Sequence, residues 1–261
     1  MLNILNKIFS STKNLNVINQ KFLKLRKETS VEKIFSAIEG FSEEAEIRYV
    51  GGCVRKIIKD EKVDDIDLAT NIEPSKVKQA LENKKINYFE TGIKHGTITA
   101  VIDNNKFEIT SLRSDIKTDG RHAEIEFTNN WVKDAERRDF TINSIYADIN
   151  GNLFDPFNGK KDLENGIINF IGNPDERIKE DYLRILRYLR FFINYSKQGH
   201  NLKIIKLLRI NIEGVINLSK ERLINELKKI IKIDTLESLL KDESSLKLIL
   251  MIFPELKLIL S

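Results

Sequence analysis

The sequence predicts an α+β protein in which a region of mixed strands and helices is followed by an all-helical region. Two observations predict this arrangement. Before about residue 172, short apolar stretches alternate with glycine-containing turns and short helix-like segments. Residues 175–261 hold only two glycines and one proline, and their leucines and isoleucines recur at helical spacing. We therefore expect an N-terminal helical segment over 1–45, a mixed sheet region over 46–172 and helices over 173–261.

The elements of the sheet region follow from local patterns. Runs of β-branched and aromatic residues indicate strands, apolar residues three and four apart indicate helices, and two strands flanking Asp-Asn-Asn indicate an antiparallel hairpin. In chain order we predict a helix within 17–40, a strand at 47–50, a short helix at 54–59, a strand at 65–70, a helix beginning at Pro74, a strand at 86–92 and a hairpin over 96–113.

The pattern is less regular after the hairpin. The polar residues 114–130 predict a loop with a short strand, residues 134–147 predict a helix, and residues 151–159 predict a turn-rich connection. Further along, SKERLINELKKI at 219–230 predicts a capped helix stabilised by i, i+4 pairs.

Composition sets broad limits on function. The formal net charge of +4 permits an acidic partner such as nucleic acid without requiring one. The single cysteine, Cys53, excludes an internal disulfide and fits a reducing compartment. No apolar run approaches the roughly eighteen residues of a membrane span, so we predict no membrane partner and a cytoplasmic location. Residues 1–27 carry six basic residues and no acid, which favours a basic amphipathic helix over an organellar transit peptide.

Asp65 and Asp67 are the first candidate site residues. Residues i and i+2 of a strand share a face, so both carboxylates lie together while Ile66 points into the core. Such a pair suits Mg²⁺, which usually takes one or two carboxylates and completes its shell with water and substrate phosphate. Glu108, on the hairpin, is the candidate for a third catalytic carboxylate. The alternative interpretation is an ordinary solvated strand face.

Gly51 and Gly52 lie between a predicted strand and the start of a helix. Without Cβ atoms they allow backbone N–H groups to approach a phosphate closely, and Arg55 adds a charged fork one turn further on. The alternative is an ordinary strand-to-helix turn.

A third group comprises Arg138, Asp139 and Asn143. On the predicted helix over 134–147, Asp139 and Asn143 are i, i+4 neighbours. Arg138 is suited to clamp a triphosphate, with Asp139 and Asn143 holding the sugar or the local backbone. The alternative is a surface run of ion pairs.

The fourth group, Asp181, Arg184, Arg187 and Arg190, recurs every three residues on a predicted helix over 180–192. A carboxylate accepts from an exocyclic amino group and a guanidinium donates to a ring nitrogen. Cytosine and adenine offer that combination and uracil and guanine do not, so Asp181 and Arg184 can select C and A. Arg187 and Arg190 are then available for phosphates. The alternative is a packed helix decorated with arginines.

Six segments occur in the order and approximate spacing seen in the class II tRNA nucleotidyltransferases, the bacterial and eukaryotic CCA-adding enzymes, and in their relatives the bacterial poly(A) polymerases. Their wording resembles the alphaproteobacterial branch, and together they cover roughly residues 46–232. The segments are GGCVRKIIKDEKVDDIDLAT, LRSDIKTDGRHAEIEF, RRDFTINSIYAD, LFDPFNGKKDLENGIINFIG, ERIKEDYLRILRYLRFF and SKERLINELKKII.

The resemblance implies a nucleotidyltransferase head with a small mixed β-sheet, followed by an all-helical neck. It implies an enzyme that adds C and A to the tRNA 3′ end from CTP and ATP and releases pyrophosphate. It places Asp65 and Asp67 on Mg²⁺ and Asp181 and Arg184 in an amino-acid template for the incoming base. Nucleotide-contacting positions fall on Gly52, Arg55, Arg138, Arg187 and Arg190.

Alternatives within and beyond the family stay open. They are an enzyme that adds only CC or only A, a poly(A) polymerase, and a non-catalytic RNA-binding remnant. The loop over 113–130, which is shortened in CC-only relatives, is present. Relatives continue past a segment like MIFPEL into domains that grip the tRNA, so we expect a naturally short protein or a fragment. The oligomeric state does not follow from the sequence.

Overall fold

The computed structural model describes residues 17–118 and 123–260. The chain divides into two compact units. The first comprises the described residues up to Asp115, together with Ile125–Arg138 and Ile142–Lys160. The second comprises the described parts of 116–124 and 161–261, together with Asp139–Thr141.

The first unit is built on a mixed seven-stranded sheet with the order β3-β4-β5-β2-β1-β8-β9. Neighbouring strands run antiparallel except β2 and β5, which pair in parallel. The strands are β1 Ile47–Val50, β2 Ile66–Thr70, β3 Asn87–Gly92, β4 Thr97–Ile102, β5 Asn105–Ser111, β8 Tyr146–Ala147 and β9 Leu153–Phe154. The strands predicted at 47–50, 65–70 and 86–92 are confirmed, whereas β9 lies where only turns were expected.

The predicted hairpin is confirmed in β4 and β5, which are joined by Asp103 and Asn104. Both turn residues have positive φ, 48° and 67°. A two-residue turn of this kind matches the right-handed twist of the strands, and Asn and Asp tolerate the left-handed conformation better than most residues.

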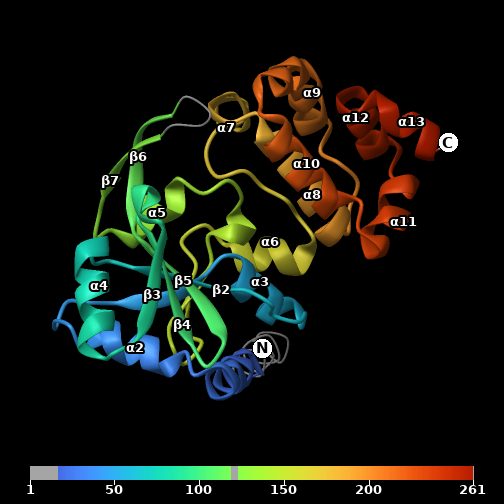
Figure 1. Cartoon of the computed structure of the whole chain (residues 1–261). Coiled ribbons are helices and arrows are strands. Elements are labelled where there is room, and N and C mark those ends of the chain that lie inside the picture. The colour runs from blue at the N-terminus through green and yellow to red at the C-terminus, as the bar shows by residue number, and fades with distance from the viewer. Residues whose placement is uncertain (1–16, 119–122, 261) are drawn as a thin grey trace, which may run out of the picture. The chain divides into compact units, whose positions relative to one another are not determined.

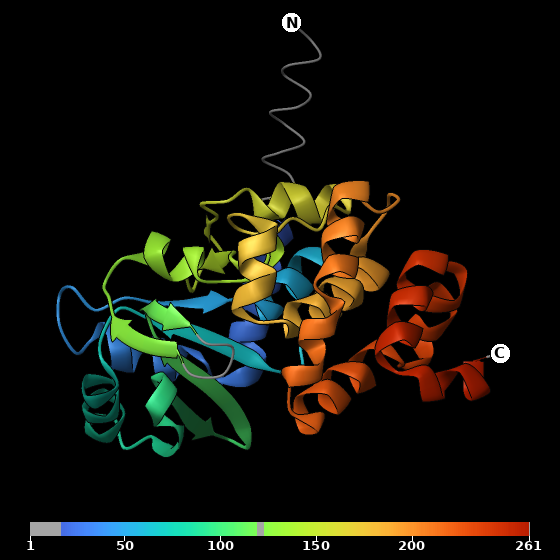
Figure 2. The same ribbon diagram turned by 90° about the horizontal axis from the view of Figure 1, so that it is seen from above.

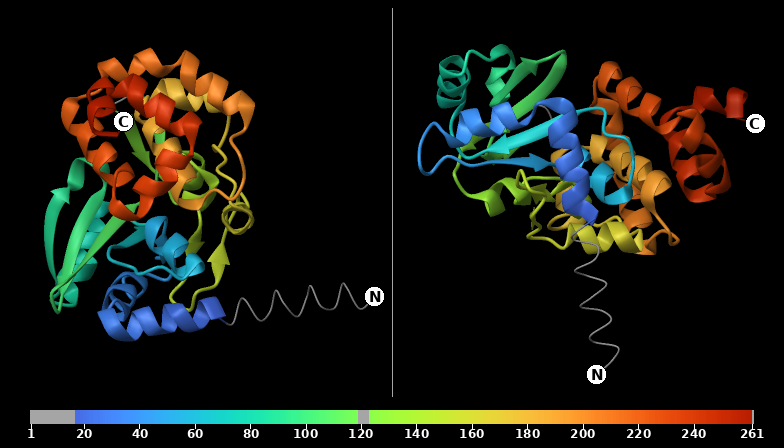
Figure 3. Two further views of the ribbon diagram at one scale, coloured as in Figure 1. Left: turned by 90° about the vertical axis from the view of Figure 1, so that its right-hand side faces the viewer. Right: turned by 90° about the horizontal axis from the view of Figure 1, so that it is seen from below.

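Helices cover one face of this sheet (Figures 1 and 3). They are a helix over 17–29, α2 Glu32–Glu39, α3 Gly52–Lys59 and α4 Pro74–Asn83, which begins at Pro74 as predicted. Phe22 of the first helix and Phe35 of α2 pack on Tyr49 of β1 with ring centroids 4.9 and 5.0 Å apart. Alternate residues of the strands enter the same core, so the opposite face is left to the remaining side chains.

Two expectations for residues 113–147 are wrong. Residues 114–130, predicted as a loop with one short strand, instead contribute to two strands, β6 Arg113–Thr118 and β7 Ala123–Phe127, which form a separate two-stranded sheet. The predicted helix over 134–147 is only α5 Trp131–Glu136, followed by the short 3₁₀ turn Thr141–Asn143. In sequence, Phe140 lies between these two elements; it has no exposed surface and its backbone forms a β-bridge to Phe170. The helix therefore does not continue through Phe140, whose ring is buried instead.

From Pro174 onwards the described part of the second unit is helical, as predicted (Figure 2). Its main helices are α7 Pro174–Glu180, α8 Leu183–Tyr195, α9 Leu202–Ile210, α10 Lys220–Ile230, α11 Ile233–Lys241, α12 Glu243–Ile252 and α13 Lys257–Leu260. An aromatic cluster of Phe140, Phe170, Tyr188 and Phe191 packs at one side of α8, with Phe170 and Tyr188 stacked at 5.9 Å. A further helix, α6 Gly159–Asn165, joins the units in sequence.

No helix in the described part of the chain is long and apolar enough to cross a membrane.

Candidate active site

Three carboxylates share one face of the sheet in the first unit. Parallel pairing of β2 with β5 places Asp67 directly opposite Glu108, and Asp65 immediately precedes β2. Their neighbours Ile66 and Phe107 are buried against the helices. Since side chains alternate along a strand, the carboxylates lie on the face away from those helices.

The charges of the two neighbouring acids act on Asp67. Burial of Asp67, together with the nearby charges of Glu108 and Asp65, raises the pKa of its carboxyl from 3.8 to about 6, although Arg138 and Arg55 oppose this shift. Three carboxylates this close together favour the binding of a cation. This arrangement of hard oxygen ligands is typical of a Mg²⁺ site.

Protein ligands alone do not form a complete metal site. Within the described residues, no group of three or more His, Cys, Asp or Glu side chains is arranged to hold a metal ion. Magnesium commonly binds through one or two carboxylates, with water and substrate phosphate supplying the other ligands. The pair Asp65 and Asp67 therefore fits Mg²⁺ in the presence of a phosphate substrate.

The glycine turn lies directly against this pair. Gly51 has φ of 65°, a left-handed conformation that favours glycine. A Cβ added to Gly52 would be 3.7 Å from Oδ2 of Asp67. The Gly51 N–H donates to the carbonyl of Ile145 at 3.2 Å, so the amides at the start of α3, beginning with Gly52, are the ones available for a phosphate.

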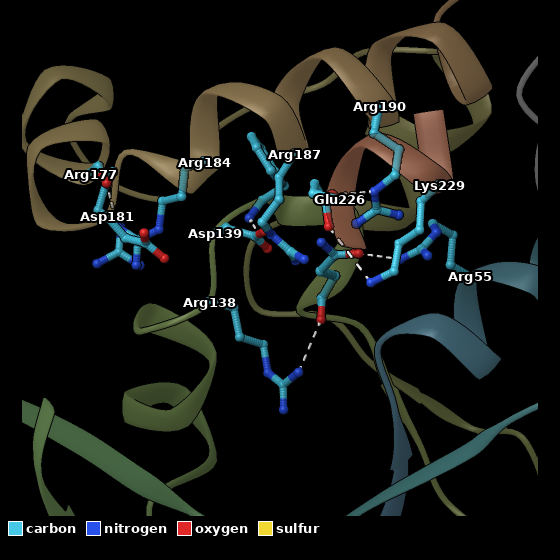
Figure 4. A network of polar contacts seen from close by, with 12 residues as sticks. Arg55, Arg138, Asp139, Arg177, Asp181, Arg184, Arg187, Arg190, Glu226 and Lys229 are labelled. Atoms are coloured by element: carbon cyan, nitrogen blue, oxygen red, sulfur yellow. Dashed lines mark hydrogen bonds and ion pairs between the residues drawn. The ribbon is translucent and has the colours of Figure 1, made fainter. Parts of the chain in front are cut away.

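Arg55 and Asn143 form a buried pair beside the turn. Arg55 is 7% exposed and donates through Nη1 to Oδ1 of Asn143, which is also 7% exposed. Asn143 comes from the 3₁₀ turn after α5, and its carbonyl accepts from Nη1 of Arg138 at 3.5 Å. Thus Gly51, Arg55, Arg138 and Asn143 lie together, and Arg55 and Arg138 are labelled in Figure 4.

Arg138 is held by a buried acid that the sequence did not single out. Asp134 is 1% exposed, and its Oδ2 accepts from Nη2 of Arg138 at 3.1 Å and from the Tyr146 hydroxyl at 2.7 Å. Nε of Arg138 donates to the same hydroxyl at 3.0 Å. The signal in the sequence was the i, i+4 spacing of Asp134 and Arg138.

Asp139 and Asn143 are not helical neighbours, because α5 ends at Glu136. Asp139 belongs to the second unit, where its Oδ2 accepts from Nε of Arg187 at 2.6 Å (Figure 4). Its Oδ1 accepts from the backbone N–H of Phe140 at 2.9 Å. Asp139 therefore holds Arg187, while Asn143 holds Arg55.

Asp181 also lies off the predicted helix, which begins at Leu183. Its backbone is extended, with φ of −154° and ψ of 103°, and its Oδ1 accepts from the Leu183 N–H at 3.1 Å. This is a helix-capping geometry that competes with continuing the helix. Oδ2 of Asp181 accepts from Nη2 of Arg222 on α10 at 2.7 Å.

The three arginines of α8 each have an acidic partner in the second unit. Arg184 donates to Glu180 and to the carbonyl of Arg177, both at 2.6 Å. Arg190 pairs with Glu226 of α10, which is 2% exposed. The opposite side of α8 is buried, including Ile185, Leu186 and Leu189, as predicted.

Arg222 and Glu226 are the residues of this cluster that sequence reasoning missed. Helical spacing places them on one face of α10, and it was interpreted only as stabilising that helix. Their partners Asp181 and Arg190 are too distant in sequence for spacing to reveal the pairing.

The first unit has a mixed sheet that presents paired carboxylates beside a glycine turn at a helix start, and a helical unit follows. These features define a nucleotidyltransferase head with a helical extension. Residues 47–169 match the family model described as the poly A polymerase head domain. This part of the chain belongs to that family, and over about 70% of its length the chain is similar to CCA-adding enzymes.

The relatives agree in name. The chain is 47% identical over 192 residues to human CCA tRNA nucleotidyltransferase 1, mitochondrial, a match that covers 72% of this chain and 44% of the human protein. It is 37% identical over 187 residues to a CCA-adding enzyme of Staphylococcus epidermidis, covering 70% and 45%. The chain thus spans about half the length of the curated relatives it matches.

Solved structures give the same result. The Bacillus stearothermophilus CCA-adding enzyme in complex with CTP matches with a TM-score of 0.66 and 26% identity, covering 77% of this chain and 48% of the other. A tRNA nucleotidyltransferase complexed with a primer tRNA and an incoming ATP analog matches with a TM-score of 0.61 and 26% identity, covering 82% and 59%. The predicted head and helical extension are confirmed.

Proposed function

We propose that this chain is a template-independent RNA nucleotidyltransferase that adds C and A to tRNA 3′ ends from CTP and ATP. The observation that carries the proposal is the closeness of Gly52 to Asp67: a Cβ added to Gly52 would lie 3.7 Å from the Asp67 carboxylate, which lies beside Glu108 on the sheet. A phosphate at the start of α3 is then next to the carboxylates. The RNA and nucleotide substrates of the proposal are inferred from the names of the relatives given above.

In the proposed reaction, the 3′ hydroxyl oxygen of the RNA attacks the α-phosphorus of the nucleoside triphosphate. A new P–O ester bond forms, the bond to the β-phosphate oxygen breaks, and pyrophosphate leaves. The hydroxyl proton passes to a carboxylate of the acidic group or to water. No covalent enzyme intermediate is needed.

The residues of the first unit position the triphosphate. Amides at the start of α3 donate to phosphate oxygens, while Arg55 and Arg138 supply positive charge close to the turn. Asp65 and Asp67 would hold Mg²⁺, which when bound activates the attacking hydroxyl and stabilises the leaving pyrophosphate. Glu108 contributes a third carboxylate charge beside Asp67.

The second unit supplies base selection in this proposal. Asp181 accepts from the exocyclic amino group of C or A, and Arg184 donates to the adjacent ring nitrogen. Arg222 and Glu180 hold these two side chains in the structure. Arg187 and Arg190, oriented by Asp139 and Glu226, are assigned to nucleotide phosphates.

The test is extension of tRNAs ending before, within or after CCA, with each nucleoside triphosphate and Mg²⁺. We expect wild type to add C and then A, and Asp65→Ala to lose about a thousandfold in rate, because several kcal/mol of metal-assisted stabilisation disappear. Asp64→Ala is the matched control, since Asp64 is also exposed but pairs with Lys56 at 3.0 Å.

The other outcomes separate the alternatives. Addition that stops after CC, or that starts only on a CC end, indicates a partial enzyme. Long A tails on a generic RNA, with no gain on a tRNA lacking CCA, indicate a poly(A) polymerase. RNA binding without Mg²⁺-dependent turnover indicates a non-catalytic remnant.

The cytoplasmic location stays a prediction, and the human relative carries the word mitochondrial in its name.

A further inference from the structure

The face of the sheet that carries the carboxylates extends across four strands. Asp67, Glu108, Thr99 and Phe89 are consecutive register partners on β2, β5, β4 and β3. Side chains directly opposite one another in a sheet share a face. These four residues therefore form a row on the sheet face opposite the helix-covered core, in which Thr99 is buried.

Phe89 is the outermost member of this row and is 58% exposed. Its neighbour Tyr88 donates its hydroxyl to Glu82 of α4 at 2.6 Å, so Tyr88 faces the helices and Phe89 faces the other way. β3 is an edge strand of the seven-stranded sheet. The ring of Phe89 is thus presented to solvent on the same face as the acids.

A lysine side chain, that of Lys106, lies in the adjacent row. Ile66 pairs with Phe107, so the residues before them, Asp65 and Lys106, also lie side by side. Lys106 is exposed and has no ion pair or hydrogen bond from its side chain among the described residues. In the row on the other side, the hydroxyls of Thr97 and Thr110 lie 2.9 Å apart.

We propose that this face binds the single-stranded 3′ end of the RNA substrate, with Phe89 stacking on a base and Lys106 pairing with a backbone phosphate. The inference rests on the proposed function, because the reacting 3′ hydroxyl must reach the carboxylates. Three strand spacings of about 4.8 Å place Phe89 roughly 14 Å from the strand of Asp67. The last few nucleotides of an RNA span that distance.

The chemistry of the face favours RNA over a protein partner. Aromatic rings that stack on bases and cations that follow the backbone are the two features of single-strand binding surfaces. Between Phe89 and the carboxylates, Thr99 is buried and the one aliphatic residue near it on this face, Val101 beside Lys106, is half-buried, so little apolar area is offered to a protein. Stacking is tolerant of sequence, as an enzyme acting on ends of changing sequence requires.

The first experiment measures extension kinetics of a tRNA lacking CCA. We expect Phe89→Ala to raise KM for the tRNA about fivefold to a hundredfold, the range of one lost stacking contact, with KM for CTP unchanged. Phe89→Tyr retains the ring and should restore KM. Leu23→Ala, at a residue 41% exposed on the helix over 17–29, is the control. Lys106→Ala should reduce the slope of the logarithm of RNA affinity against the logarithm of salt concentration by about one, the contribution of one phosphate contact.

The second experiment needs neither turnover nor nucleotide. Phe89→Trp places an indole on this face, and a short single-stranded RNA should quench its fluorescence relative to wild type, whose sole tryptophan is Trp131. Absence of quenching contradicts the inference, as does an unchanged tRNA KM in an active Phe89→Ala enzyme, and both leave the proposed function intact. If wild type extends no RNA, the proposed function fails, and the titration alone decides between RNA binding and none.

Discussion

At the scale of single residues, Asp134 is the clearest case of a charge held by its surroundings. Burial opposes its ionisation, but Arg138, Arg137 and the Tyr146 hydroxyl hold the pKa of its carboxyl well below 3.8. Asp134→Asn leaves two guanidinium groups without their acid. We expect a loss of about 3–5 kcal/mol in the free energy of unfolding at pH 7, measured by urea denaturation.

The pH dependence of this effect has a definite sign. A carboxyl whose folded-state pKa is depressed contributes stability above its unfolded pKa, near 3.8, and loses it as the pH falls towards the folded pKa. The gap between wild type and Asp134→Asn should therefore be constant from pH 7 to about 5 and shrink below about 4. Glu136→Gln, on the exposed side of α5, should stay within about 0.5 kcal/mol of wild type. A gap that widens in acid would contradict the assignment.

At the scale of elements, α8 and α10 are joined by the buried pair of Arg190 and Glu226. Glu226 is 2% exposed and also lies 3.6 Å from Lys229. Glu226→Gln removes the charge that compensates Arg190, so we expect a loss of about 3 kcal/mol in unfolding free energy. Far-ultraviolet circular dichroism during denaturation measures it.

Glu221→Gln is the matched control, because Glu221 is exposed on the same helix. It should change stability by less than about 0.5 kcal/mol. Equal losses in the two variants would mean that the helix depends on its overall charge and not on the buried pair.

Helix α5, which ends at Glu136, shows where prediction of helices from local pattern fails. Of the helix predicted over 134–147 only residues 134–136 are helical, as the end of α5, because Asp139 and Phe140 turn instead to Arg187 and the aromatic cluster of the second unit. Burying a large ring yields more than the helical propensity of a few residues, so the local preference is overridden.

At the scale of the whole molecule, the proposed function predicts a change in base choice. Asp181→Ala removes the acceptor for the amino group of C and A, so selectivity over U and G should fall by about tenfold or more. The measurement is extension of a tRNA lacking CCA with each of the four nucleoside triphosphates. Glu213→Ala, an exposed acid of the same unit, is the control. Unchanged selectivity in Asp181→Ala would contradict the assigned role.

The sequence by itself determined the features that depend on near neighbours. The turn at Asp103 and Asn104, the start of α4 at Pro74 and the shared face of Asp65 and Asp67 follow from local backbone geometry. Only the tertiary structure decided which distant side chains meet. The parallel pairing that places Glu108 beside Asp67, and the ion pair of Asp181 with Arg222, join segments far apart in the chain. Their energies depend on distances in space, which residue spacing does not encode.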